Sequence, residues 1–138
     1  MQKLIVDTNV VISALIQKSY PYLIISTLFI PRKIELCVSD EILKEYYAVL
    51  GRKKFMKYPD FVSNATKVLA DIENKAKWYM PKVKVQLLTD PDDNKLLELA
   101  HECKADYLIT GNTNHFNIAH YKRTKIVSPK EYWELYRN

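Results

Sequence analysis

Short runs of apolar residues alternate along the chain with longer segments in which apolar residues recur every three or four positions. The runs are typical of strands covered on both faces, whereas the longer spacing predicts amphipathic helices. Strands are expected at 4–6, 34–38, 105–110 and 125–127. Helices are expected at about 10–16, 23–30, 40–50, 60–79 and 90–103, and from 129 onward. This alternation predicts an α/β fold with a mostly parallel sheet, in a single domain covering residues 1–138.

Residues that start helices bound two of these elements. Ser39 is a good N-cap for the helix that follows it. Ser128, Pro129 and Glu131 form a capping box with proline at the first helical position. The last helix is therefore expected to begin at Pro129.

The composition narrows the class of protein. The chain has 138 residues, of which 48% are hydrophobic, and no apolar run approaches the length of a membrane span. The first residues do not have the pattern of a signal peptide. Cys37 and Cys103 lie in apolar patterns and are expected to be buried free thiols. Both observations predict a cytoplasmic location. Two glycines cannot build a glycine-rich phosphate loop, which excludes P-loop NTPases and dinucleotide-binding Rossmann enzymes.

Two acidic residues stand just past predicted strands. Asp7 follows the apolar run at 4–6, and Glu41 stands just past the run at 34–38. In an open parallel sheet, ligands bind beyond the carboxyl ends of the strands, so both acids are candidate functional residues. The alternative is that Asp7 caps the following helix and that Glu41 is a favourable charge at a helix N-terminus.

A third acidic group consists of Asp90, Asp92 and Asp93, which crowd the entry to a helix. Three carboxylates within four positions exceed what capping needs, and they repel one another unless a cation holds them. Together with Asp7 and Glu41 they predict an all-oxygen site for Mg²⁺ or Mn²⁺. The three histidines lack zinc-site spacing and are interpreted as surface or structurally satisfied residues.

Residues 52–59 are basic, with aromatic residues between the charges. The net charge of +5 permits binding to a polyanion, and segments of this kind hold phosphates and stack bases. The alternative is a solvated linker. The candidate nucleic-acid-binding residues are Arg52, Lys53, Lys54 and Lys57.

Several stretches resemble the PIN-domain nucleases. They are Leu4-Ile5-Val6-Asp7-Thr8-Asn9, Ser39-Asp40-Glu41-Ile42-Leu43, Asp90-Pro91-Asp92-Asp93-Asn94-Lys95 and Ala105-Asp106-Tyr107-Leu108-Ile109-Thr110-Gly111-Asn112. The resemblance covers nearly the whole chain, in the order and spacing typical of the family. PIN domains are metal-dependent ribonucleases with a three-layer α/β/α fold, and many small members are VapC-like toxins of toxin–antitoxin pairs.

Carried over by position, the resemblance implies which residues act. Asp7, Glu41 and Asp93 match the family's acidic metal ligands and are the expected catalytic residues. The choice of Asp93 over its neighbour rests on the family register. The resemblance further implies a Mg²⁺ or Mn²⁺ cofactor, an RNA substrate, a homodimer and a possible antitoxin partner. Supporting roles fall to Thr8, Asp90, Asp92 and Asn112, the last of which stands where many members have a fourth acid.

Two rival functions are weighed against this one. Haloacid-dehalogenase-like phosphatases need an acid two residues after Asp7, where Asn9 stands, and a receiver domain needs paired acids at the end of the first strand. A non-catalytic RNA-binding or partner-binding module that kept the acids is the stronger alternative, because Asn112 replaces the fourth acid. Detecting metal-dependent RNA cleavage separates the enzyme from the binding module.

Overall fold

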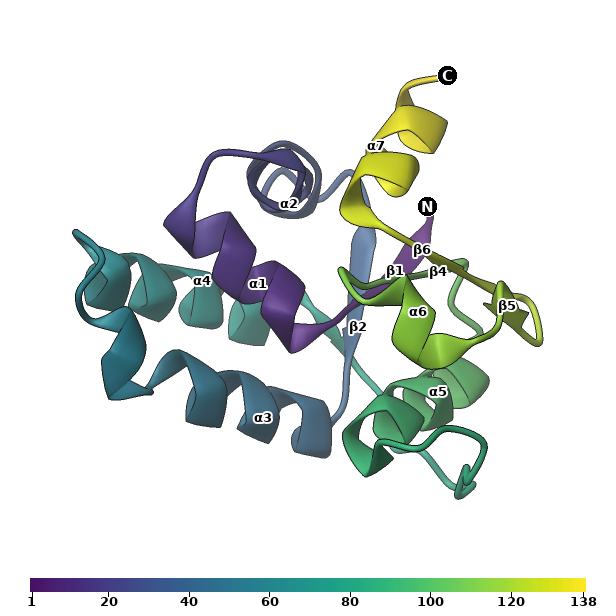
Figure 1. Cartoon of the computed structure of the whole chain (residues 1–138). Helices are drawn as coiled ribbons and strands as arrows, with labels where there is room; N and C mark the ends of the chain where they lie inside the picture. Colours follow the sequence, from purple (N-terminus) through teal and green to yellow (C-terminus); the bar gives the residue numbers. More distant parts are fainter.

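The computed structural model describes residues 1–138 and is built around a six-stranded sheet. The strands are β1 (Lys3–Val6), β2 (Glu35–Val38), β3 (Lys77–Trp78), β4 (Tyr107–Ile109), β5 (His120–Tyr121) and β6 (Thr124–Val127). They lie in the order β3-β2-β1-β4-β6-β5, and only β5 runs antiparallel to its neighbour. The first strand of the chain is therefore central in the sheet (Figure 1). This arrangement confirms the predicted α/β class with a mostly parallel sheet.

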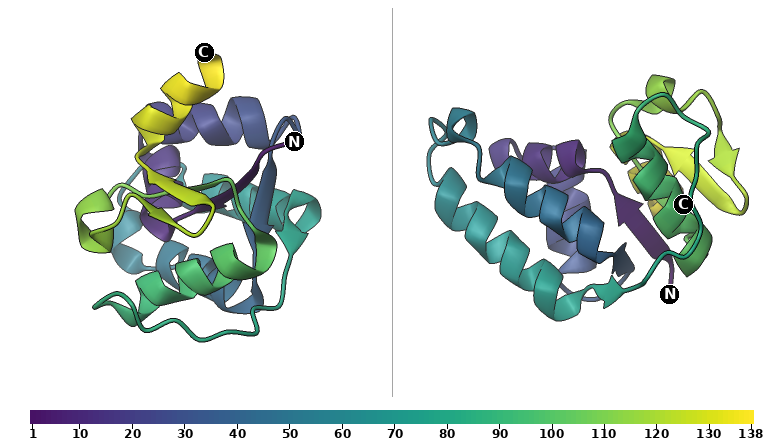
Figure 2. Two further views of the ribbon diagram at one scale, coloured as in Figure 1. Left: turned by 90° about the vertical axis from the view of Figure 1, so that its right-hand side faces the viewer. Right: turned by 90° about the horizontal axis from the view of Figure 1, so that it is seen from below.

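Helices lie on both sides of the sheet. They are α1 (Thr8–Ile16), α2 (Tyr20–Leu23), the π-helix η1 (Ile24–Phe29), α3 (Asp40–Leu50), the 3₁₀ turn η2 (Lys53–Phe55), α4 (Phe61–Lys75), α5 (Pro91–Cys103), α6 (Thr113–Phe116) and α7 (Pro129–Arg137). Figure 2 shows α1, α3 and α4 grouped on one side of β1 and α5 on the other. The carboxyl end of β1 therefore faces the starts of helices from both layers.

The central strand is held rigidly at its carboxyl end. Leu4, Ile5 and Val6 are almost completely buried and belong to one core of 36 apolar residues. The buried hydroxyl of Tyr46 on α3 donates a hydrogen bond to the backbone carbonyl of Val6. Because this bond reaches the last residue of β1, it fixes α3 against the point where Asp7 begins.

The predicted helix starts agree with the structure. The Ser39 hydroxyl accepts the backbone N–H of Ile42 at 3.3 Å, and α3 spans Asp40–Leu50 as expected. The capping box at α7 is complete, with the Glu131 backbone N–H donating to the Ser128 hydroxyl at 3.1 Å and the Ser128 N–H donating to the Glu131 carboxylate at 3.0 Å. Both starts are encoded locally, by one or two side chains and the adjacent backbone.

The predicted helix over 60–79 is wrong at its end. α4 stops at Lys75, and Lys77 and Trp78 form the edge strand β3, which pairs in parallel with Cys37 and Val38 of β2. Hydrogen bonding to a neighbouring strand overrides the local helical pattern here, which a reading of periodicity does not include. The short elements β5 and α6 are likewise absent from the sequence prediction, since neither is long enough to show a period.

Both cysteines are buried free thiols, as predicted. Cys37 lies on β2 and Cys103 ends α5, so both belong to the apolar core. None of the helices combines the length and apolar character needed to span a bilayer.

Candidate active site at the carboxyl end of the sheet

A hollow of about 230 Å³ opens at the carboxyl end of β1, bounded by the starts of α1 and α5, the middle of α3 and the start of α6. It is lined almost entirely by polar side chains, and its oxygen-bearing residues come from four separate elements. This is the place where ligands are expected in a parallel α/β sheet. The acidic and amide residues that line it are Asp7, Glu45, Asp90, Asp92, Asp93 and Asn112.

Asp7 is the most buried carboxylate of the hollow, with 8% of the residue exposed. It holds the N-cap position of α1 without a side-chain capping hydrogen bond. Burial raises the pKa of Asp7, while a hydrogen bond from the Thr110 hydroxyl at 2.9 Å lowers it. The backbone N–H groups of Asn9 and Thr8 also lower the pKa of this carboxyl. The hydrogen bond from Thr110 thus orients the Asp7 carboxylate and partly offsets the unfavourable burial of its charge.

Thr110 joins the ends of β1 and β4 and is completely buried. Its hydroxyl accepts the backbone N–H of Asn112 at 3.1 Å and stands 2.9 Å from the Asp7 carboxylate. Because the hydroxyl accepts from Asn112, its own proton is directed at Asp7. The sequence reasoning missed Thr110; the available signal was a hydroxyl at the end of a fully buried apolar strand.

The structure does not place Glu41, the acid expected on α3, among the residues that line this hollow. Glu45, one helical turn further along α3, lines the hollow instead and accepts a hydrogen bond from the Thr8 hydroxyl at 2.5 Å. Burial raises the pKa of Glu45, and the neighbouring charges of Asp92 and Asp7 raise it further. The second turn of α3, and not the first, meets the start of α1, which explains the displacement by four residues. Glu45 stands three residues after the buried Ile42, so an acid within the apolar stripe was the available signal.

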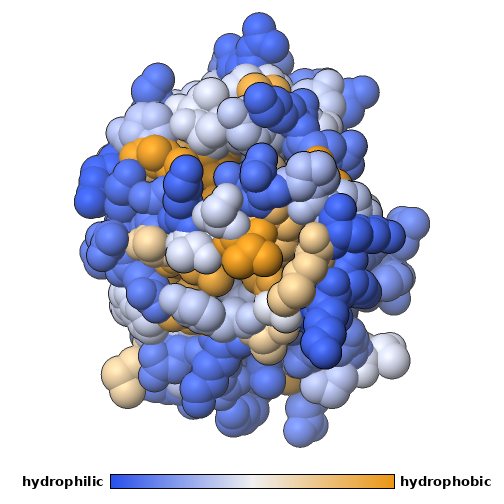
Figure 3. Space-filling view, turned by 90° about the vertical axis from the view of Figure 1, so that its left-hand side faces the viewer, coloured by the Kyte–Doolittle hydropathy of each residue, from blue (hydrophilic) through white to orange (hydrophobic).

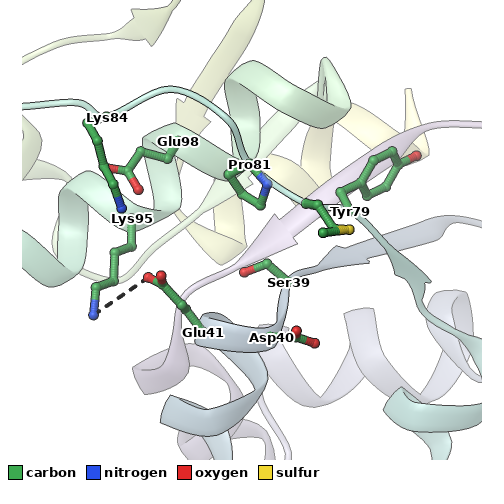
Figure 4. Close-up of a pocket in the computed structure, with 9 residues that line it drawn as sticks. Ser39, Asp40, Glu41, Tyr79, Pro81, Lys84, Lys95 and Glu98 are labelled. Atoms are coloured by element: carbon green, nitrogen blue, oxygen red, sulfur yellow. Dashed lines mark ion pairs between the residues drawn. The ribbon is translucent and has the colours of Figure 1, made fainter.

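Glu41 faces a separate, smaller hollow beside the first turn of α3. Its carboxylate lies 3.8 Å from the ammonium group of Lys95, and both side chains are about half exposed (Figure 4). Lys84 and Glu98 come from the other side of this hollow. Glu41 therefore has a cationic partner, unlike Asp7, Glu45 and Asp93.

The three acids at the start of α5 have different surroundings. Asp90 is the N-cap and accepts the backbone N–H of Asp92 at 2.9 Å, while Asp92 is mostly exposed and lies 3.8 Å from Lys95. Burial and the charges of Asp90 and Asp7 raise the pKa of Asp93 to about 6, and His115 opposes this. Of these three acids, Asp93 is the one whose ionised form is most disfavoured by its surroundings.

A pair of buried polar side chains on α5 fixes the loop that leads to these acids. Asn94 accepts the backbone N–H of Leu88 at 2.8 Å and donates to its carbonyl at 3.0 Å. One turn later, Glu98 accepts the backbone N–H of Val85 at 3.0 Å. The extended loop before α5 is thereby held against the helix, and it delivers Asp90 in a defined position.

Two basic side chains also line the hollow. Arg52 reaches it from the end of α3, and His115 reaches it from α6. Lys53, Lys54 and Lys57 do not line the hollow. Of the four candidate nucleic-acid-binding residues in the basic segment 52–59, only Arg52 does. His115 was interpreted from the sequence as a surface or satisfied residue, and no sequence signal distinguished it.

The donor set fits a hard divalent cation in its chemistry. Carboxylate and amide oxygens dominate the hollow, and these are the ligands that Mg²⁺ and Mn²⁺ prefer. As the side chains stand, no three of the protein's His, Cys, Asp or Glu residues are close enough together to hold one ion. The hollow therefore contains oxygen ligands of the right kind, but their side chains do not yet converge on one point where an ion could bind.

Comparisons with known proteins cover this whole region. A family model described as a PIN domain matches residues 3–114, a range that includes Asp7, Glu45, Asp93 and Asn112. The chain is also similar to an uncharacterized protein of Methanocaldococcus jannaschii, with 30% identity over 141 residues that cover 96% of this chain and 90% of that protein. No solved structure gives a significant match.

Proposed function

Because the chain belongs to the PIN-domain family, a family of nucleases, we propose that it is a metal-dependent endoribonuclease that uses Mg²⁺ or Mn²⁺. The observation that carries this proposal is the gathering of Asp7, Glu45 and Asp93 in one polar hollow without an ion-pairing cation. Groups whose pKa values are raised by burial and by one another are typical of functional sites.

Asp7, Glu45 and Asp93 are the residues proposed to hold the ion, with Asn112 as a neutral oxygen donor. A bound divalent ion supplies Lewis acidity toward the phosphoryl oxygens and activation of water. Asp93 lies on the first turn of α5 and is only partly buried, so we propose that a bound ion would draw its side chain toward Asp7. Glu41 keeps only its ion pair with Lys95 in this proposal.

The remaining residues of the hollow orient these donors. Thr110 holds one oxygen of Asp7, and Thr8 holds one oxygen of Glu45, which leaves the other oxygen of each carboxylate available to a ligand. Asp90 fixes the start of α5 as its cap. These contacts reduce the number of rotamers that must be frozen when a cation binds.

The test is cleavage by purified protein of a 5′-labelled single-stranded RNA in EDTA, MgCl₂ or MnCl₂. We expect cleavage with either metal and none in EDTA. The Asp93→Asn variant, purified in parallel, controls for contaminating ribonuclease and should show no cleavage. RNA binding without cleavage under all three conditions would instead identify the non-catalytic RNA-binding module.

We further propose that the protein acts in the cytoplasm as a VapC-like toxin with an antitoxin partner. In support, a second hollow of about 500 Å³ lies between the α1–α2 connection, η1 and α4, lined by Leu15, Ile25, Ile30 and Val68. Figure 3 shows apolar side chains gathered on this side of the molecule. Contiguous apolar surface with a polar rim is typical of protein-binding sites.

Co-purification with the product of a neighbouring gene tests whether an antitoxin partner exists. Light scattering tests whether the protein forms the homodimer that we also propose.

A further inference from the structure

Arg52 and His115 are the basic residues of a hollow that also contains five carboxylates. They stand on different walls, and the backbone of each is fixed: the Arg52 N–H donates to the Val49 carbonyl at 3.1 Å, and the His115 N–H donates to the Asn112 carbonyl at 3.0 Å. Arg52 thus continues the end of α3, while His115 belongs to the single turn of α6. Their positions relative to the acids are set by the fold.

Neither side chain pairs with the acids beside it. The four ion pairs of the protein involve Lys75, Lys95 twice and Arg123, and neither Arg52 nor His115 makes a side-chain hydrogen bond. A purely structural role would place the Arg52 guanidinium on one of the neighbouring carboxylates. Instead, both basic groups line the hollow with their donors unused.

Resting on the proposed function, we propose that Arg52 and His115 form a two-sided phosphate clamp that holds an RNA phosphodiester in the hollow. An anionic phosphate entering a hollow with five carboxylates meets repulsion, which a bound cation only partly removes. A guanidinium donates two parallel hydrogen bonds to phosphate oxygens, and an imidazole N–H donates one whether or not the ring is charged. The two donors supply the attraction that the acids lack.

The other basic residues of this segment have different surroundings. The Lys54 ammonium lies 5.2 Å from the ring centre of Phe55, and that of Lys57 lies 5.4 Å from the ring centre of Tyr58. These side chains lie over neighbouring rings and do not line the hollow. Within residues 52–59, Arg52 is therefore the residue assigned to the cleavage site, and the lysines are left to contact RNA further along the strand.

The experiment measures affinity for a fluorescent 12-nucleotide single-stranded RNA by anisotropy in CaCl₂, across a series of salt concentrations. The variants are Arg52→Ala, Arg52→Lys and His115→Ala. Arg137→Ala and His120→Ala are matched controls, because both residues are exposed and neither lines the hollow. Far-UV circular dichroism and thermal unfolding confirm that each variant is folded.

We expect Arg52→Ala to weaken binding about tenfold and to reduce the slope of log affinity against log salt by about 0.7, the loss of one phosphate contact to a single strand. His115→Ala should weaken binding three- to tenfold, Arg52→Lys should recover part of the loss, and both controls should stay within twofold. If Arg52→Ala and His115→Ala bind like their controls, the clamp is wrong even when the wild-type protein cleaves RNA. If they lose affinity as expected while the wild-type protein does not cleave, the clamp stands and the proposed catalysis fails.

Discussion

At the amino end of β1, the carboxylate of Asp106 accepts the backbone N–H of Lys3 at 2.8 Å and the guanidinium of Arg123 at 2.9 Å. At the carboxyl end of the same strand, the side-chain donor to Asp7 is the neutral hydroxyl of Thr110. One acid is matched by donors that include a full positive charge. The other is buried beside further acids and has no charged partner.

This comparison distinguishes Asp106, which stabilises the fold, from the acids of the hollow, which destabilise it. Charge-assisted hydrogen bonds are stronger than neutral ones, so Asp106 strengthens the contact between β1 and the start of β4. Burial raises the pKa values of Asp7, Glu45 and Asp93, and the charges of neighbouring acids raise them further, which means that their charges are unfavourable in the metal-free protein. Clusters of carboxylates with unfavourable charges are typical of functional sites, where a bound ligand offsets their repulsion.

The largest contrast is expected between Asp7→Asn and Asp106→Asn. Asp7→Asn removes a proposed ion ligand, so RNA cleavage with Mn²⁺ should fall at least about a thousandfold, while the midpoint of thermal unfolding in EDTA should hold or rise. Asp106→Asn should leave cleavage within about threefold of wild type and lower stability by about 1 kcal/mol, since its ion pair is partly exposed. Equal loss of cleavage in the two variants would remove the distinction between the two ends of the strand.

A smaller contrast is expected along α3. Glu45→Gln removes a carboxylate from the hollow and should lower the cleavage rate about 10- to 100-fold, whereas Glu41→Gln removes only an exposed ion pair with Lys95 and should change the rate less than threefold. Initial rates at saturating RNA compare the two. A larger effect at Glu41 than at Glu45 would restore the position expected from the sequence.

The smallest effect is a pH dependence of stability in EDTA. The pKa of Asp93 is about 6 in the folded protein against an ordinary value of 3.8, so the folded state binds the proton more tightly than the unfolded state. The stabilisation is therefore fully present below about pH 4 and is lost as the pH rises through 6. Asp93→Asn should reduce this loss by up to about 1 kcal/mol in urea unfolding at pH 4.5 and 7. Glu134→Gln is the control, because Glu134 is exposed and lies outside the hollow, and it should keep the wild-type slope.

The parts of the fold that the sequence predicted are those encoded by neighbouring residues. The apolar run before Asp7, the Ser39 cap and the Ser128 capping box each depend on a few adjacent positions, and each is where it was expected. The strand β3 forms by pairing of Lys77 with Cys37, forty residues earlier in the chain, so the sequence around Lys77 alone does not predict it.

The candidate site was predictable to the same extent. Asp7 follows from the end of a buried strand, and Asp93 follows from acids in excess of capping needs together with the register of the family resemblance; the structure places both in one hollow. Glu45 and Glu41 differ by one helical turn, and only the contact between α3 and the start of α1 decides which of them faces Asp7. The position of His115 depends on the short turn α6, which is too brief to show a periodic pattern in the sequence.

The hydrogen bond between Thr110 and Asp7 joins residues 103 positions apart in the chain. β1 precedes one of its two neighbours in the sheet, β4, by more than half of the sequence, so β4 is synthesised well after β1. Pairing of such distant segments is slow and comes late in folding. Asp7 thus gains its orienting partner Thr110 only after β4 has been synthesised, so a nascent chain that ends before β4 carries the acids of the site without this contact.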